Sequence, residues 1–143
     1  MAYEFQVAVD CADPHTLAEW WAETLGWQVE PSDEAFIRRM ISAGYAAESD
    51  TTLHNGVLVW KDGAAIRHPD GLERAPRLLF QQVPEPKTVK NRIHWEVTVG
   101  DVQPLLTSGA ALLREPDDEI DWYVLGDPEG NEFCAFVSPD TAF

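Results

Sequence analysis

The sequence predicts an α+β fold built from two halves of similar order, each a strand, a helix and three further strands. Residues 91–99 and 132–137 alternate polar and apolar side chains, as half-buried strands do. A helix start signal follows the first strand of each half at equal spacing, because Gln6 precedes Asp13 by seven residues and His94 precedes Asp101 by seven. These patterns predict a βαβββ module that occurs twice, with the proline-rich residues 84–87 as the connector.

The first half, about residues 1–84, begins with a strand and a helix. Asp13 is placed to cap that helix, Pro14 suits its first turn, and Gly26 suits the left-handed residue that ends it. Strands are expected where apolar residues alternate or are bounded by turn residues, over 3–10, 27–30, 56–60, 64–67 and 77–83.

An additional helix lies inside the first half. Ser32 is placed to cap it, and Gly44 marks its expected end. The small polar residues 46–56 predict a loop. Asp62-Gly63 is a strong turn signal, so the strands on either side of it are expected to pair as a hairpin.

The second half, about residues 91–138, repeats this order in a shorter form. Asp101 is placed to cap a short helix and Gly109 to end it, while residues 127–131 predict a tight turn. The strands of this half are expected over 93–99, 111–113, 121–125 and 132–137.

Composition limits the classes of partner. The 143 residues contain 25 acidic and 10 basic side chains, a formal net charge of −15, which disfavours nucleic acid and anionic membranes. No apolar run is long enough to span a bilayer. The two cysteines, Cys11 and Cys134, form no disulfide framework, so we expect a cytoplasmic protein with reduced thiols.

Period-two counting places four side chains with chemical potential on one face of the second half. These are His94, Glu96, Glu132 and Cys134. His94 and Glu96 are the candidate catalytic pair, because an imidazole beside a carboxylate can serve as a general base or orient a ligand. The alternative is that His94 is a partly buried imidazole bonded to a neighbouring strand. Cys134 is expected to pack as a small hydrophobe, since no basic neighbour in sequence activates it.

The same counting gives a candidate ligand pocket of aromatic and polar side chains, namely Phe80, Gln82, Trp122 and Phe136. A two-layer core or a dimer interface would need similar residues. Lys87, Lys90 and Arg92 form a basic cluster that could hold a ligand carboxylate or phosphate. Pairing with surface carboxylates or with a second subunit is the favoured reading of that cluster.

Three segments resemble the vicinal oxygen chelate superfamily, which includes glyoxalases, bleomycin resistance proteins and extradiol dioxygenases, and more narrowly its small glyoxalase-like proteins. They are residues 10–27, 79–94 and 127–134, where the last reads Asp-Pro-Glu-Gly-Asn-Glu-Phe-Cys. The resemblance implies a single domain of two βαβββ modules that form an open, cup-shaped mixed sheet with helices outside, usually in homodimers. Residues 32–56 match less well and are expected to be an insertion.

The resemblance also implies metal positions on the inward strand faces, which fall on Gln6, His94 and Cys134. Cys134 stands where metal-using members carry a glutamate, so the hard anionic donor that suits Mn or Fe is missing. A thiolate favours Zn instead, although two good donors are few for a site. A divalent metal (Zn, Mn, Fe or Ni) is therefore an alternative, and no cofactor is the favoured expectation.

Three functional hypotheses follow. The preferred one is a sequestering or resistance-type domain that binds a small, mainly apolar or aromatic molecule in its cup. The second is a metal-dependent lyase, isomerase or dioxygenase of the same superfamily. The third is a non-catalytic dimerisation domain whose cup is filled by side chains.

Overall fold

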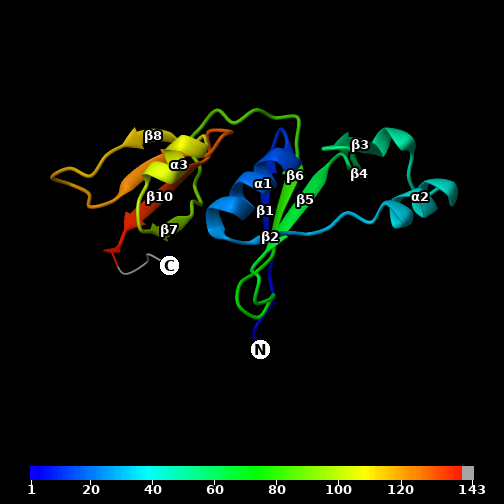
Figure 1. The fold of residues 1–143 in the computed structure, drawn as a ribbon, viewed down its shortest axis with the longest axis horizontal. Coiled ribbons are helices and arrows are strands. Elements are labelled where there is room, and N and C mark those ends of the chain that lie inside the picture. The colour runs from blue at the N-terminus through cyan, green and yellow to red at the C-terminus, as the bar shows by residue number, and fades with distance from the viewer. Residues whose placement is uncertain (140–143) are drawn as a thin grey trace. The chain divides into compact units, whose positions relative to one another are not determined.

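The computed structural model describes residues 1–139 and divides into two compact units, unit 1 up to Pro86 and unit 2 from Lys87 onward (Figure 1). Unit 1 contains two α-helices, a 3-10 turn and six strands: β1 (Val7–Cys11), α1 (Pro14–Leu25), β2 (Gln28–Val29), α2 (Glu34–Ser42), η1 (Glu48–Asp50), β3 (Thr51–His54), β4 (Val57–Trp60), β5 (Gly63–Arg67) and β6 (Leu78–Gln82). Unit 2 contains β7 (Glu96–Val99), α3 (Gln103–Ser108), β8 (Ala111–Arg114), β9 (Tyr123–Gly126) and β10 (Glu132–Val137).

The two units contain sheets of identical topology. The strand order is β1-β6-β5-β2 in unit 1 and β7-β10-β9-β8 in unit 2. In each sheet the first strand of the module pairs with the last one in parallel, and the other pairs are antiparallel. The predicted α+β fold of two βαβββ modules is therefore confirmed.

Helix α1 forms as its sequence predicts. An Asp13 carboxylate oxygen accepts a hydrogen bond from the Thr16 amide at 3.3 Å, Pro14 occupies the first turn, and Gly26 ends the helix with φ 68°. The apolar stripe of α1 packs against β5 and β6, where Trp21 and Leu17 are almost completely buried. This contact forms the core of unit 1.

The region between β2 and β5 departs from the prediction. Residues 46–56 are not a loop, because β3 lies among them and pairs with β4 as a hairpin. Asn55 and Gly56 form the turn with φ values of 51° and 79°, and Asn-Gly favours such a turn because both residues tolerate positive φ. The predicted pairing of 56–60 with 64–67 is wrong: β4 pairs with β3, and β5 pairs with β6 and β2. The insertion thus includes a hairpin as well as a helix.

Two helix caps shift by one residue from the predicted positions. Asp33, not Ser32, caps α2 by accepting a hydrogen bond from the Phe36 amide at 3.0 Å, while Ser32 Oγ donates to the Leu58 carbonyl at 2.8 Å. Val102 occupies the N-cap position of α3, although the Asp101 carboxylate still accepts from the Gln103 amide at 3.0 Å. None of the helices within residues 1–139 is long and apolar enough to cross a bilayer.

Candidate functional site

A pocket of about 250 Å³ lies on one face of the unit 2 sheet. This volume is just below the range of about 300–1,000 Å³ that is typical of small-molecule sites. Its wall includes the four residues that period-two counting groups on one face, namely His94, Glu96, Glu132 and Cys134. Trp122 and Val124 are also part of the wall.

Strand register explains why these side chains meet. Cys134 on β10 lies opposite Glu96 on β7 and opposite Val124 on β9, and residues paired across a sheet point to the same face. Phe133 and Ala135 point to the other face, where both are completely buried. One face of β10 therefore belongs to the core and the other faces the pocket.

An aromatic pair fixes one wall of the pocket. The Trp122 ring stacks on Phe136 with centroids 5.4 Å apart and an interplanar angle of 30°. This stacking holds the indole against Phe136, so its remaining surface is a preformed apolar platform.

Phe80 and Gln82 do not join this pocket. They belong to unit 1, where Phe80 is completely buried opposite Val9 and Ala64. Gln82 Nε2 donates to the Ala12 carbonyl at 3.2 Å. The prediction assigned them to the wrong face because residues 78–80 are all apolar, so alternation alone does not fix which side faces α1.

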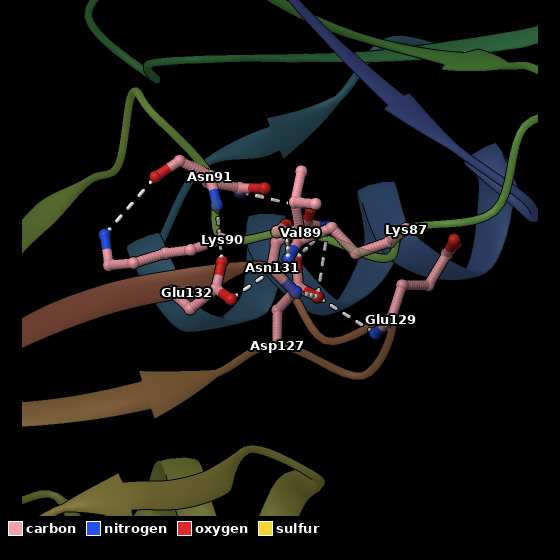
Figure 2. Close-up of polar contacts among 8 residues, drawn as sticks. All are labelled: Lys87, Val89, Lys90, Asn91, Asp127, Glu129, Asn131 and Glu132. Carbon is pink, nitrogen blue, oxygen red and sulfur yellow. Dashed lines mark hydrogen bonds and ion pairs between the residues drawn. The ribbon is translucent and has the colours of Figure 1, made fainter.

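The turn before β10 is held by one carboxylate (Figure 2). Asp127, which is almost fully buried, accepts hydrogen bonds from the Glu129 amide at 2.9 Å and the Asn131 amide at 3.0 Å. Gly130 has φ 86°, a conformation that suits glycine. The Asn131 side chain donates to both Asp127 carboxylate oxygens, and its own oxygen accepts from the Asn91 side chain at 3.2 Å. The turn therefore holds residue 91 in place, and we call this hydrogen-bonded group of Asp127, Asn131 and Asn91 the clamp.

Glu132 is part of the same clamp rather than a free base (Figure 2). Its carboxylate accepts from the Asn91 amide at 2.9 Å and from Lys87 Nζ at 3.0 Å, and Lys87 also donates to the Val89 carbonyl. Burial by itself would raise the pKa of Glu132, but these hydrogen bonds and the Lys87 charge outweigh it and hold the pKa at about 2. Glu132 thus remains an anion committed to Lys87 and Asn91.

His94 and Glu96 are the pocket groups best placed for acid–base chemistry. His94 Nε2 lies 3.9 Å from Glu96 Oε1, with 33% of the His94 side chain and 63% of the Glu96 side chain exposed. This separation is longer than a hydrogen bond, so the imidazole stays available to a ligand. His94 lies two residues before the start of β7. The backbone carbonyl of Trp95, the residue between them, accepts a hydrogen bond from the Cys134 amide at 2.9 Å.

The unit 2 donors do not fit a metal ion by themselves. Burial raises the pKa of the Cys134 thiol and the Glu96 charge raises it further, which disfavours the thiolate that binds metals. Glu132 is occupied by Lys87 and Asn91. Within residues 1–139, no group of three or more His, Cys, Asp or Glu side chains could hold a metal ion. Gln6, the third predicted ligand, belongs to unit 1, where its side-chain oxygen accepts from Arg77 at 3.3 Å.

The pocket wall also includes two basic side chains, Lys90 and Arg114. Arg114 is absent from the predicted site because a bulge in β8, between Leu112 and Arg114, turns it opposite Val124. No signal in the sequence marks that bulge. Arg114 Nη2 lies 2.7 Å from Asp117 and 2.8 Å from Glu119, and bonds to these two carboxylates raise the pKa of the guanidinium.

The chain has the fold of the glyoxalase, bleomycin resistance and dioxygenase superfamily. It is similar to the fosfomycin resistance protein FosX from Mesorhizobium loti, with a TM-score of 0.58 and 8% identity over 96% of this chain and 93% of that one. A possible glyoxalase from Bacillus cereus gives a TM-score of 0.56 and 13% identity over 92% of this chain and 95% of that one. A glyoxalase/bleomycin resistance protein/dioxygenase family enzyme from Burkholderia phytofirmans gives a TM-score of 0.52 and 14% identity over 91% of this chain and 94% of that one.

The sequence itself identifies one family within this superfamily. The model of the glyoxalase-like domain family matches residues 6–136, and the chain belongs to that family. Comparison with curated protein sequences gave no significant match.

Proposed function

We propose that this domain binds a small, mainly aromatic molecule on the unit 2 sheet and sequesters it without covalent chemistry. The observation that carries the proposal is the Trp122–Phe136 stack, an aromatic platform held in place beside His94 and Glu96. A ring stacked on Trp122 would displace water from apolar surface, and His94 would orient its polar end. The fosfomycin resistance protein among the similar structures is compatible with a protective role.

Titration with aromatic fragments, followed by calorimetry, tests this proposal. Saturable binding is expected for the wild type, with affinity reduced at least tenfold in Trp122→Leu because the stacking surface is lost. Trp27→Leu is the matched control, since Trp27 lies in unit 1 against His68 and is expected to leave affinity unchanged. No saturable binding, or equal loss in both variants, would contradict the proposal.

A second candidate function is acid–base catalysis, which the approach of Glu96 to His94 favours. His94 would remove a proton from a carbon next to a carbonyl group of a bound ligand, and Glu96 would stabilise the imidazolium. Hydrogen–deuterium exchange at that carbon, followed by NMR, tests it with aromatic ketones. Exchange is expected to be lost in His94→Gln. Equal exchange in the wild type and the variant would exclude this function.

We also propose that the protein is a cytoplasmic homodimer. Large apolar side chains are exposed on and next to the unit 1 insertion, including Tyr45 and Leu53. Burying such side chains against a second copy would remove them from water. Sedimentation analysis is expected to give twice the 16.0 kDa mass of the chain. A monomer at micromolar concentration would refute the dimer.

A further inference from the structure

The basic side chains in and around the unit 2 pocket differ in how they are paired. Lys87 is bound to Glu132 at 3.0 Å. Arg114 is bound to Asp117 and Glu119. Each of these cations already has an anionic partner, so neither needs a ligand to balance its charge.

Lys90 is the exception. Its ammonium donates to the Asn91 carbonyl at 3.3 Å, and within residues 1–139 no carboxylate lies within 4.0 Å of it. An ammonium group has three N–H donors, so this single long bond leaves two for another partner. Of these three cations, Lys90 is thus the one that lines the pocket without an acidic partner among residues 1–139, and its exposure keeps the ammonium accessible to a ligand.

The backbone at Lys90 is held through its neighbour Asn91, while the Lys90 side chain is exposed (Figure 2). The Asn91 amide is bound to Glu132, and the Asn91 side chain is bound to Asn131. The backbone next to Lys90 is therefore attached to β10. Burial and the Glu96 charge raise the pKa of the Cys134 thiol, and the Lys90 charge lowers it by a smaller amount.

We propose that the molecule bound in this pocket carries an anionic oxygen group, a carboxylate or its equivalent, which pairs with Lys90 while its ring stacks on Trp122. This inference rests on the proposed binding function and specifies the ligand class. The His94 imidazole lies in the same wall and supplies a further hydrogen bond to the ligand. The ligand class is thus a planar aromatic acid rather than a neutral arene.

Three sources of negative charge oppose such a ligand: the net charge of the chain, Glu96 and Glu132. Glu132 is already paired with Lys87 at 3.0 Å, and solvent or salt weakens the other two. The net charge of −15 acts over distance, and physiological salt screens it beyond about 8 Å. The Glu96 side chain is 63% exposed, so solvent reduces its repulsion. A direct contact with the Lys90 ammonium is short and is screened far less, so it decides the preference.

Matched pairs of acids and amides test the inference. Benzoate, 2-naphthoate and indole-3-acetate are each compared with the corresponding carboxamide, which keeps the ring and loses the charge. At 0.15 M salt the wild type is expected to bind at least one acid tenfold or more tightly than its amide. Lys90→Gln is expected to bring that ratio close to one and to leave amide affinity unchanged.

Arg92→Gln is the matched control variant. Arg92 lies two residues from Lys90, is exposed and is not in the pocket wall, so the substitution removes the same charge from the same segment. Its acid-to-amide ratio is expected to stay within threefold of the wild-type ratio. An equal loss in both variants would assign the preference to general charge rather than to Lys90, and would overturn the inference.

The remaining outcomes separate the inference from the function on which it rests. If amides bind as tightly as acids in the wild type, or if the preference survives Lys90→Gln, the ligand class is wrong while the binding function stands. If no acid and no amide shows saturable binding, both proposals fail. Circular dichroism spectra of the variants, expected to match the wild type, confirm that the substitutions leave the fold intact.

Discussion

The two units have the same strand order and carry different chemistry at corresponding positions. With Gln6 as the counterpart of His94, the strand registers make Ala8 the counterpart of Glu96 and Leu79 that of Cys134. Leu79 lies opposite Ala65, and Cys134 lies opposite Val124. Gly63 lies two residues before Ala65 and Trp122 two residues before Val124, so Gly63 corresponds to Trp122.

This difference shows how one backbone can serve as scaffold in one unit and as site in the other. The positions of Trp122, Glu96 and Cys134 are taken in unit 1 by Gly63, Ala8 and Leu79, which provide neither an aromatic platform nor a titratable group. Gly63 has no positive φ, and a Cβ atom there would make ordinary contacts of 3.6 Å with Leu79 and Phe80. The backbone therefore does not require glycine, and side-chain choice alone separates the two faces.

The helices differ in the same sense. Helix α1 has 12 residues and buries six of them, including Trp20 and Trp21. Helix α3 has six residues and buries Leu105. Unit 1 thus has the larger helix-to-sheet core, whereas unit 2 relies more on its sheet and on the clamp around Asp127.

The largest effect is expected from removing the central side chain of the smaller core. Phe133→Ala deletes a completely buried ring and leaves a cavity, so the free energy of unfolding should fall by about 3–5 kcal/mol. Denaturant titration measures it. Val137→Ala, at an exposed position of the same strand, is the control and should change the value by less than about 1 kcal/mol. Equal effects would contradict the burial assigned to Phe133 at the centre of the unit 2 core.

The turn clamp should contribute the next largest effect. Asp127→Ala leaves the amides of Glu129 and Asn131 without their acceptor, which should cost about 2–3 kcal/mol in the free energy of unfolding. The corresponding residue of unit 1 is His68, whose Nδ1 accepts one hydrogen bond within residues 1–139, from the Asp70 amide at 3.0 Å. His68→Ala should therefore cost about 1 kcal/mol. A larger loss for His68 would reverse the assignment of the clamp to unit 2.

The acid dependence of unit 2 should follow Glu132. Its folded pKa of about 2 lies below the ordinary value of 4.5, so its stabilisation is present above pH 4.5 and is lost as the pH falls towards 2. Glu132→Gln should cost roughly 2 kcal/mol at pH 7, and the difference from the wild type should shrink between pH 4.5 and 2. Unfolding titrations at several pH values measure this.

The comparison variant lies in unit 1. A hydrogen bond from Arg77 lowers the pKa of Glu30, partly opposed by burial, and Arg77 stands where unit 2 has Glu132. Glu30→Gln should show the same direction of pH dependence with a smaller amplitude. A difference between Glu132→Gln and the wild type that is independent of pH would show that the carboxylate charge is not what stabilises unit 2.

The smallest effect on stability is expected from exchanging corresponding site residues. His94→Gln places the residue of unit 1 in unit 2, and because His94 makes only a 3.9 Å approach to Glu96, the free energy of unfolding should change by less than about 0.5 kcal/mol. Aromatic acid affinity should nevertheless fall measurably. A stability loss above 2 kcal/mol would make His94 a structural residue and remove it from the site.

Much of the site followed from alternation along strands, and the rest depended on information that alternation lacks. His94, Glu96 and Cys134 were grouped correctly because polar and apolar residues alternate clearly around them. Phe80 and Gln82 were misplaced because three successive apolar residues leave the phase of β6 undetermined. Arg114 depends on a bulge whose position follows from pairing across strands.

The fold, like the site, could be predicted in part from the sequence. Repeated cap and turn signals at equal spacing identified both modules, because local backbone preferences at Asp13, Pro14 and Gly26 agree with the final structure. The β3–β4 hairpin is not predicted, although Asn55-Gly56 signals it, because the small polar residues around it favour a loop. Pairing partners of β4 and β5 required knowledge of the whole sheet.

The clamp has a consequence for how such domains change their ligands. Asp127 and Asn131 organise the turn, Asn131 and Glu132 tether Asn91, and Lys90 is next to it. A substitution at Gly130, which is outside the pocket wall and has φ 86°, is therefore expected to disturb the turn and, through Asn131 and Asn91, the backbone at Lys90. If the proposed binding holds, changes in the hairpin turn could alter specificity while every residue of the pocket wall is kept.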